Sequence, residues 1–317
     1  MDNIKSVLTR EELTVFTLRA LYSEYGYAQY KMSKFEEYEL YMRNKDFLVS
    51  DNIITFNDTD GRLLALKPDV TLSIIKNNKD NPEGLLKAQY NEHVYRISGS
   101  TQSFAELMQV GLECIGKVGE NETVETLFLA KESLDLICED NILAISQLDI
   151  LEALMEHFSL SREARRSLLK NLEAKSSSGI CEAMADEGLS EKDVCLLSSL
   201  ADIYGAPASV LPRLDAFRVS EKANAAINSL IKVTDMLAGR GVSRIFVDFS
   251  LVGDMKYYNG IAFKGFIEGI PDSVISGGQY DRLLERMGRK SKAIGFAVYL
   301  DELDRLPAEK ALIGGEK

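Results

Sequence analysis

The first apolar pattern of the chain has the spacing of a helix. In TREELTVFTLRALYSEYGY the apolar positions recur every three or four residues, at Leu13, Phe16, Ala20 and Leu21. Thr9 followed by Glu12 is typical of a capping box, in which each side chain bonds the other residue's backbone N–H. Gly26 is a suitable stop signal, because glycine ends helices in the left-handed conformation. The pattern predicts one helix between these signals.

Patterns typical of strands follow this helix. Asp60-Gly61 lies between the apolar runs of IITFNDTDGRLLAL and predicts a β-hairpin. KPDVTLSIIKN predicts another helix, with Pro68 near its first turn. LKAQYNEHVYRI and ELMQVGLECIG then predict two strands, joined by SGSTQSFA.

From about residue 121 to residue 240 the spacing is mostly helical. The part from 160 to 220 has short helices separated by Ser and Gly, and it predicts a helical insertion outside the sheet. Strand patterns return in RIFVDFSL, GIAFKGFIEG and DSVISGG, and AIGFAVYLDELDRL predicts a strand followed by a helix. This order favours an α+β fold with a mainly antiparallel sheet of six or seven strands, flanked by helices.

Composition narrows the classes of function. The 317 residues are 45% hydrophobic, yet no apolar run approaches the roughly 18 residues of a membrane helix. The first residues, MDNIKSVLTREEL, do not resemble a signal peptide, so we expect a cytoplasmic protein without membrane contact. The formal net charge of −12 would repel nucleic acid, so we expect no nucleic-acid partner.

The sequence offers little for metal or nucleotide chemistry. The four cysteines form no CxxC pair, and we expect buried, reduced thiols at Cys114, Cys138, Cys181 and Cys195. The chain has only two histidines, and nothing near them supports a zinc site or a catalytic triad. GxGxxG and P-loop motifs are absent. We therefore expect no metal and no cofactor.

Four segments, in order from about residue 67 to residue 303, carry a family resemblance. LKPDVT is similar to Leu-Arg-Pro-Glu-Gly-Thr of histidyl-tRNA synthetase, a class II synthetase. VYRI with MQVGLECIG resembles the motif-2 strand and Gln-Leu-Gly-Cys-Glu of that family. DMKYYNGIAF resembles its histidine loop, and SGGQYDRLL with IGFAVYLDEL resembles Ser-Gly-Gly-Arg-Tyr-Asp and motif 3. The resemblance implies a class II synthetase-like core over the whole chain, with 307–317 as a C-terminal tail.

The resemblance implies that seven residues bind histidine: Asp69, Thr71, Arg96, Gln109, Glu113, Tyr257 and Tyr258. In the family, the first two positions hold the α-amino group, and the glutamine and glutamate also contact the amino acid. The two tyrosines frame the imidazole, and the arginine contacts carboxylate and phosphate. The residue types suit these roles, because carboxylates accept from an ammonium group and arginine pairs a carboxylate.

The positions that would handle ATP depart from the family. Adenylate formation needs cations directed at the phosphates, but ISGSTQSFAELM, residues 97–108, contains no basic residue. Glu302 stands where the motif-3 arginine belongs, and Gly253 where the histidine-loop arginine belongs. Lys256 replaces the loop aspartate. These losses predict that the chain does not activate an amino acid and has no catalytic residues of its own.

A synthetase core with these losses resembles the regulatory subunits of ATP phosphoribosyltransferase, the first enzyme of histidine biosynthesis. The chain ends about a dozen residues after the motif-3 segment, so we expect no anticodon-binding domain. In that family the subunit joins a short-form catalytic subunit, is required for its activity and carries feedback inhibition by histidine. The resemblance implies these partners, and a homodimer within a hetero-octamer of four plus four subunits.

The sequence leaves alternatives open. The tyrosine pair could fill a core, Asp69 could stabilise a helix N-terminus, and Arg96 could form a surface ion pair. Histidine could bind at the interface with the partner rather than in the synthetase-like pocket. A truncated amino-acid-activating enzyme is the alternative function, and an interaction module with a decayed pocket is a third.

Overall fold

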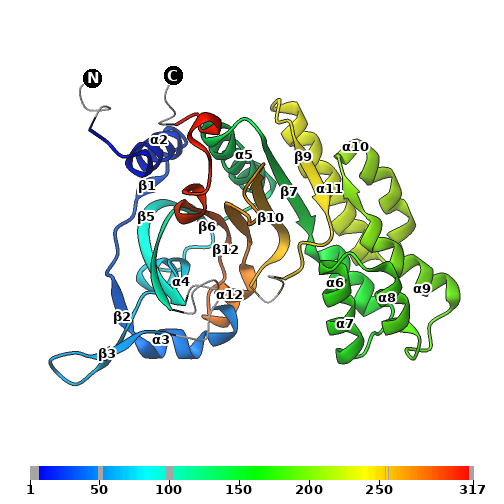
Figure 1. The fold of residues 1–317 in the computed structure, drawn as a ribbon. Coiled ribbons are helices and arrows are strands. Elements are labelled where there is room, and N and C mark those ends of the chain that lie inside the picture. The colour runs from blue at the N-terminus through cyan, green and yellow to red at the C-terminus, as the bar shows by residue number, and fades with distance from the viewer. Residues whose placement is uncertain (1–6, 49–52, 98–102, 254, 256, 314–317) are drawn as a thin grey trace.

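A mixed β-sheet forms the centre of the molecule (Figure 1). The computed structural model describes residues 7–48, 53–97, 103–253, 255 and 257–313. Within these residues the sheet has nine strands in the order β1-β5-β6-β12-β11-β10-β7-β9-β8. Their bounds are β1 Ala28–Gln29, β5 Leu85–Ile97, β6 Phe104–Gly116, β7 Asn141–Gln147, β8 Tyr204–Gly205, β9 Ile245–Asp248, β10 Asn259–Ile267, β11 Ile275–Gln279 and β12 Lys292–Tyr299.

The expected antiparallel character of the sheet is confirmed, but the expected six or seven strands are too few. Among the described residues, β1 pairs with β5 and β7 with β9 in parallel, while the other neighbours are antiparallel. The two outermost strands, β1 and β8, have two residues each. Such short strands have no periodicity to detect, and tertiary contact alone creates them.

Strand β7 lies inside the segment that the sequence pattern assigned mostly to helices. NILAISQ is buried at all but one position, because β9 and β10 flank it and helices cover its face. A strand buried on both faces loses the polar–apolar alternation that identifies a strand. Two helices flank this strand in the sequence, α5 (Glu120–Ile137) and α6 (Leu148–His157). The strand therefore lies in a stretch whose spacing is otherwise helical.

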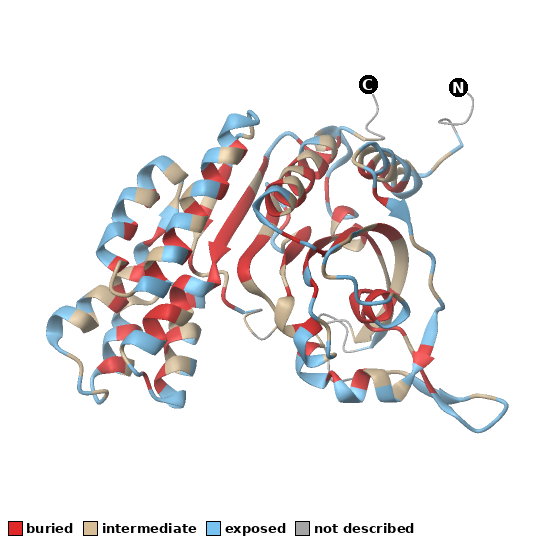
Figure 2. Cartoon of the chain, turned by 180° about the vertical axis from the view of Figure 1, so that it is seen from behind, coloured by how far each residue is buried: buried red, intermediate tan, exposed pale blue. Residues whose placement is uncertain are grey.

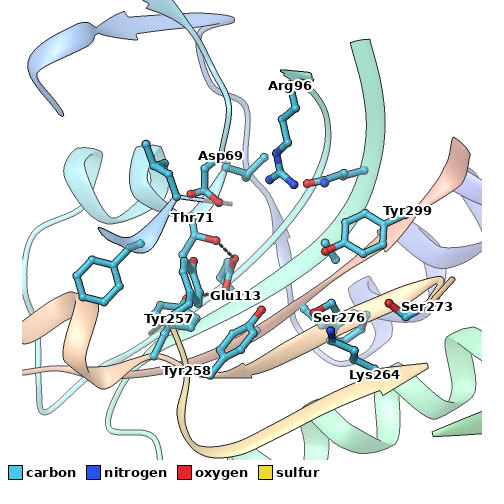
Figure 3. A pocket seen from close by; sticks show the side chains of 18 of the residues that line it. Asp69, Thr71, Arg96, Glu113, Tyr257, Tyr258, Lys264, Ser273, Ser276 and Tyr299 are labelled. Carbon is cyan, nitrogen blue, oxygen red and sulfur yellow. Dashed lines mark hydrogen bonds between the residues drawn. The ribbon is translucent and has the colours of Figure 1, made fainter. Parts of the chain in front are cut away.

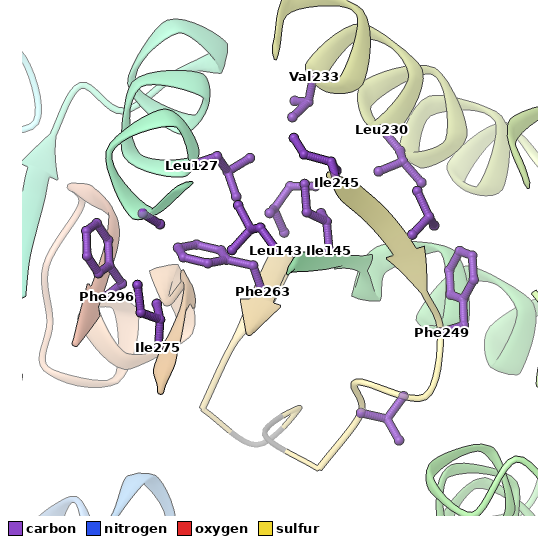
Figure 4. Close-up of a cluster of buried hydrophobic side chains, with 14 of the residues drawn as sticks. Leu127, Leu143, Ile145, Leu230, Val233, Ile245, Phe249, Phe263, Ile275 and Phe296 are labelled. Atoms are coloured by element: carbon purple, nitrogen blue, oxygen red, sulfur yellow. The ribbon is translucent and has the colours of Figure 1, made fainter. Parts of the chain in front are cut away.

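One face of the sheet is covered by three long helices, α2 (Arg10–Glu24), α5 and α11 (Glu221–Gly239). Figure 4 shows Leu127 of α5 and Leu230 of α11 above the apolar side chains of the central strands. Tyr22 of α2 is fully buried and its hydroxyl lies 2.9 Å from Ser133 Oγ of α5. This apolar layer fixes the sheet and leaves its opposite face for the functional site.

The remaining elements surround the other face or the side of the sheet. A small sheet, in the order β2-β4-β3, contains the predicted hairpin. Its strands are β2 Phe35–Glu37, β3 Thr55–Asn57 and β4 Leu63–Leu66. The short helices of this part are α3 Tyr38–Arg43, η1 Lys45–Phe47, α4 Thr71–Asn77, α12 Asp281–Arg286, α13 Leu300–Leu303 and η4 Ala308–Lys310.

The region expected to be a helical insertion lies at one side of the molecule, beside α6 and β9 (Figure 1). It contains α7 Arg162–Glu173, α8 Ser177–Met184, α9 Glu191–Ser198, η2 Ser199–Asp202, α10 Pro207–Val210 and η3 Leu211–Phe217. Its outer surfaces are exposed, whereas the sheet and the inner helix faces are buried (Figure 2). This region is not wholly outside the sheet, because β8 lies within it and pairs with β9.

Several local predictions are confirmed. Thr9 and Glu12 form the capping box of α2, and Gly26 follows the helix with φ of 82°. The prediction of four buried thiols is half wrong: Cys114 and Cys138 are buried, but Cys181 and Cys195 are exposed on α8 and α9. A cysteine on a helix can point into the core or toward solvent, and the spacing of the cysteines in the sequence does not reveal which.

Candidate functional site

All seven residues that the resemblance implied line one pocket of about 370 Å³ (Figure 3). The pocket lies on the face of the sheet opposite the long helices. Alternation along β6 explains this, because Val110, Leu112 and Cys114 belong to the apolar core while Gln109 and Glu113 line the pocket. The volume suits a small molecule, since ligand pockets are typically about 300–1,000 Å³.

Small residues keep the floor of the pocket open. A Cβ at Gly295 of β12 would lie 1.8 Å from Glu113 Oε2, so only glycine leaves room for that carboxylate. A Cβ at Gly278 of β11 would likewise lie 2.8 Å from the ring of Tyr258. Gly278 of SGGQYD and Gly295 of β12 therefore have a packing role: they leave room for the side chains of Tyr258 and Glu113 at the sheet surface.

Glu113 is the most deeply placed carboxylate of the pocket, with only 2% of its surface exposed. Thr71 Oγ1 donates a 2.7 Å hydrogen bond to its Oε1, and the Tyr280 hydroxyl donates a 2.5 Å bond to its Oε2. Burial raises the pKa of Glu113 to about 8, although both hydrogen bonds act in the opposite direction. Burial therefore favours the protonated form of this carboxyl at neutral pH.

Asp69 precedes α4 and is 8% exposed. It accepts a 2.9 Å hydrogen bond from the Leu72 backbone N–H, so the helix-terminus interpretation of this residue is correct. It lines the pocket as well. Burial raises its pKa, and the nearby positive charge of Arg96 counteracts that shift. One carboxylate thus stabilises the helix start and presents a negative charge to the cavity.

Arg96 lies near the end of β5 and reaches the pocket from the Asp69 side (Figure 3). Its Nε donates a 2.7 Å hydrogen bond to the Pro68 carbonyl, which joins the strand end to the segment that carries Asp69. Gln109 is buried on β6, opposite Tyr299 of β12. Arg96 is therefore held by backbone inside the site, which differs from the expected alternative of a simple surface ion pair.

The tyrosine pair forms one wall. The rings of Tyr257 and Tyr258 meet edge to face with centroids 4.8 Å apart, and Tyr257 also packs 5.9 Å from Tyr280 and 6.3 Å from Phe47. These contacts belong to a small apolar cluster of their own. The two interpretations of the pair are thus compatible, since it fills this cluster and lines the pocket. Burial raises the pKa of Tyr257 well above its usual value, so its hydroxyl stays neutral.

The two described positions where the family has an arginine, Gly253 and Glu302, lie in different places. Gly253 lines the pocket, and a Cβ there would lie 3.1 Å from Glu173 Oε1 of α7. Glu302 lies in α13, pairs with Arg305 at 3.0 Å and is not among the pocket-lining residues described. Lys256 and residues 98–102 lie outside the described residues. Neither described position supplies a cation to the pocket.

Sequence reasoning missed several pocket residues: Tyr90, Lys264, Ser276, Tyr280 and Tyr299. Lys264 carried a signal, because it is a charge inside the otherwise apolar strand GIAFKGF. Arg282, in the segment SGGQYDRLL, pairs with Glu152 of α6. The other missed residues gave no comparable signal, because serine is usually exposed and tyrosine is intermediate in burial, so neither residue type indicates a pocket by itself.

The described residues contain neither a metal-binding cluster nor a membrane-spanning helix. Histidine, cysteine, aspartate and glutamate nowhere gather there in a group of three that could hold a metal ion. None of the helices in that part of the chain has the length and apolarity needed to cross a bilayer.

Comparison with known proteins identifies the family. Residues 5–303 match the family model described as histidyl-tRNA synthetase. A curated relative from Thermoanaerobacter sp. (strain X514), named ATP phosphoribosyltransferase regulatory subunit, is 31% identical over 89% of this chain and 75% of its own length.

Solved structures agree with this fold. The structure of an ATP phosphoribosyltransferase regulatory subunit/histidyl-tRNA synthetase from Bacillus halodurans has a TM-score of 0.81 at 25% identity, and the match covers 94% of this chain and 79% of that one. A chain of the ATP phosphoribosyl transferase complex from Thermotoga maritima has a TM-score of 0.71 at 18% identity, with 90% and 96% covered. The class II synthetase-like fold expected from the motifs is thereby confirmed. The chain belongs to the histidyl-tRNA synthetase family and, within it, to the ATP phosphoribosyltransferase regulatory subunits.

Proposed function

We propose that this chain acts in the cytoplasm as the regulatory subunit of ATP phosphoribosyltransferase and transmits feedback inhibition by histidine. The observation that carries the proposal is a pocket with two buried carboxylates, Asp69 and Glu113, in a chain that has Gly253 and Glu302 at the two positions where the family places catalytic arginines. The carboxylates, Thr71 and the tyrosine wall suit an amino acid with a cationic or aromatic side chain.

The same pocket is poorly equipped for adenylation. Losing one preorganised donor at a developing charge costs about 2.7–4 kcal/mol in transition-state stabilisation. Gly253 offers no side chain at all, and Glu302 has the wrong charge. We therefore expect the pocket to bind its amino acid without activating it, which is the behaviour of a sensor.

The proposed partner is a short-form ATP phosphoribosyltransferase catalytic subunit. Support comes from the Thermotoga maritima complex, one chain of which has the same fold as this chain. We propose that pairs of this chain assemble with the catalytic subunit into a hetero-octamer, and that the histidine pocket and the partner's active site are coupled by about 1–3 kcal/mol. Such coupling is reciprocal, so substrates of the partner should weaken histidine binding.

Reconstitution tests the proposal directly. The purified chain is titrated into a short-form catalytic subunit, and phosphoribosyl transfer to ATP is measured with and without histidine. We expect activity to rise to a plateau as the chain is added, and histidine to lower that plateau. An activity that does not depend on the chain would contradict the regulatory role, whereas activation without any effect of histidine would contradict sensing alone.

A truncated amino-acid-activating enzyme remains the alternative, favoured by the match to the histidyl-tRNA synthetase model over residues 5–303. Histidine-dependent exchange between ATP and pyrophosphate separates the two functions. We expect no exchange above background for the chain alone or in the complex. Robust exchange would require another source for the charge that Gly253 and Glu302 do not supply.

A further inference from the structure

The hydroxyl group of Tyr280 bonds to another residue of the pocket. The side chain is 1% exposed, and its hydroxyl donates the 2.5 Å hydrogen bond to Glu113 Oε2. Burial raises the pKa of Tyr280 well above its usual value, so the hydroxyl keeps its proton and remains a donor. An effect of this hydroxyl on a ligand therefore passes through Glu113.

Two backbone contacts fix the position of Tyr280. Its N–H donates a 3.0 Å hydrogen bond to the Ala293 carbonyl of β12, and the Ala293 N–H donates a 2.8 Å bond to Asp281 Oδ1. Both bonds hold the turn between β11 and α12 against the neighbouring strand. The ring also packs with its centroid 5.9 Å from that of Tyr257. The hydroxyl is thus presented to Glu113 by a rigid part of the fold.

The carboxyl group of Glu113 is held from three elements. Tyr280 bonds Oε2, and Thr71 at the start of α4 bonds Oε1 at 2.7 Å. Gly295, the partner of Glu113 on β12, leaves the space that Oε2 occupies. Rotation of the carboxyl group would break one of the two hydrogen bonds, so the group is preorganised before a ligand arrives.

These contacts limit what Glu113 can recognise. A carboxylate oxygen can accept two hydrogen bonds, so each oxygen of Glu113 keeps capacity for one more. In its ionised form the group accepts from a ligand N–H, and in its protonated form it donates to a bare nitrogen. A ring with one N–H and one bare nitrogen can satisfy either form. A ring without nitrogen would leave a buried polar group without its partner, which costs affinity.

Glu113 lies at the aromatic end of the pocket. Its donor Tyr280 packs against Tyr257, whose ring belongs to the tyrosine wall. Figure 3 shows Arg96 toward the opposite end, beyond Asp69, and the charge of Arg96 acts on that aspartate. We therefore expect the ring of a bound amino acid to lie at the tyrosine wall, within reach of Glu113.

We propose that Tyr280 is a positioning residue for ligand selection, whose hydroxyl holds Glu113 in the orientation in which the carboxyl group bonds a nitrogen of the effector's ring. This inference rests on the proposed histidine pocket. It adds the residue that makes the pocket selective for a ring that contains nitrogen.

Calorimetry of two amino acids tests the proposal. Histidine and 3-(2-thienyl)alanine, whose five-membered ring contains sulfur and no nitrogen, are titrated into the full chain in complex with a short-form catalytic subunit. We expect the wild type to prefer histidine by at least about tenfold, because the analogue leaves Glu113 without its partner. Tyr280→Phe removes only the hydroxyl, and it should lower histidine affinity about tenfold and leave thienylalanine affinity unchanged.

Tyr22→Phe is the matched control. Tyr22 is also fully buried, and its hydroxyl lies 2.9 Å from Ser133 Oγ on the other face of the sheet. This variant loses a comparable buried hydrogen bond and should leave both affinities unchanged. Tyr280→Leu replaces Tyr280→Phe if circular dichroism shows that the latter does not fold.

A double-mutant cycle separates positioning from a general loosening of the pocket. If Tyr280 acts through Glu113, Tyr280→Phe should not change the preference further in a Glu113→Ala background. Additive effects, a preference that survives Tyr280→Phe, an equal loss in Tyr22→Phe, or equal wild-type affinities for the two ligands would overturn the positioning role while histidine binding itself persists. Absence of histidine binding to the wild type would overturn the histidine pocket and the positioning role together.

Discussion

The helical region from α7 to η3 and the pocket face of the sheet differ in the kind of side chain that they bury. In the helical region the buried positions are mainly apolar, such as Leu168, Ile180 and Leu200. Its longer helices, and α11 after it, begin with a serine that accepts a backbone N–H, at Ser161, Ser176, Ser190 and Ser220. The pocket instead buries carboxylates, an amide and hydroxyls.

This difference separates residues kept for folding from residues kept for binding. Serine caps and an apolar core stabilise a fold by local rules. A buried carboxylate such as Glu113 acts against stability, because it loses hydration and its pKa rises. Groups of this kind cluster at functional sites, so the contrast supports the proposed pocket as the binding site.

The largest expected effect on stability lies in the helical region. Leu168 of α7 is fully buried, and Leu168→Ala should lower the free energy of unfolding by about 2–5 kcal/mol through lost contacts and a cavity. Urea denaturation measures this. Histidine affinity should not change at temperatures where the variant is folded. A parallel loss of affinity would contradict the separation of the two regions and point to the place where Glu173 of α7 lies near Gly253.

In the pocket, by contrast, we expect a buried carboxyl to make the stability of the fold depend on pH. Glu113 has a folded-state pKa of about 8 and an ordinary value of 4.5. The folded state therefore keeps its proton while the unfolded chain releases it, and this stability contribution is complete below about pH 4.5 and lost as pH rises to about 8. Glu113→Gln should flatten that loss, by on the order of a few kcal/mol.

Thermal unfolding of Glu113→Gln across this pH range provides the measurement. Glu83→Gln is its control, since Glu83 is exposed and pairs only loosely with Lys117 at 3.6 Å. The control should keep the wild-type slope of stability against pH. Identical slopes for both variants would mean that Glu113 carries no trapped proton.

Asp69→Asn separates the two roles of Asp69. Asparagine still accepts from the Leu72 N–H, so stability should change little. Loss of the charge facing the ligand should reduce histidine affinity by about tenfold to a hundredfold, measured by calorimetry on the complex. Asp80→Asn is the control, because Asp80 also accepts backbone N–H groups, at Lys290 and Ser291, but lies outside the pocket. Unchanged histidine affinity would leave Asp69 with its helix role alone.

The smallest effect is expected at a helix cap. Ser161 Oγ accepts from the Ala164 N–H at the start of α7, and Ser161→Ala should cost about 1 kcal/mol of stability. Urea denaturation should detect this loss, with histidine affinity intact. A loss of affinity comparable to that of Asp69→Asn would show that the helical region serves the pocket directly.

Prediction from sequence was accurate where the physics is local. The capping box at Thr9, the Asp60-Gly61 hairpin and the long strands β5 and β6 follow from short-range patterns. The seven pocket residues could be named because motif order resembles that of a family. Strand β7 could not be identified, since burial on both faces removes alternation, and β1 and β8 are too short to have a pattern.

The sequence by itself determined the fold class, the family resemblance and the residue types that an amino-acid pocket requires. Tertiary structure decided which of these meet. It placed Glu113 between Thr71 and Tyr280, turned Arg96 toward Asp69, and set Lys264 beside Ser276. The physical reason is that sheet register and burial act between residues far apart in the chain. They give a carboxylate or a lysine its charge environment, and no local pattern contains that information.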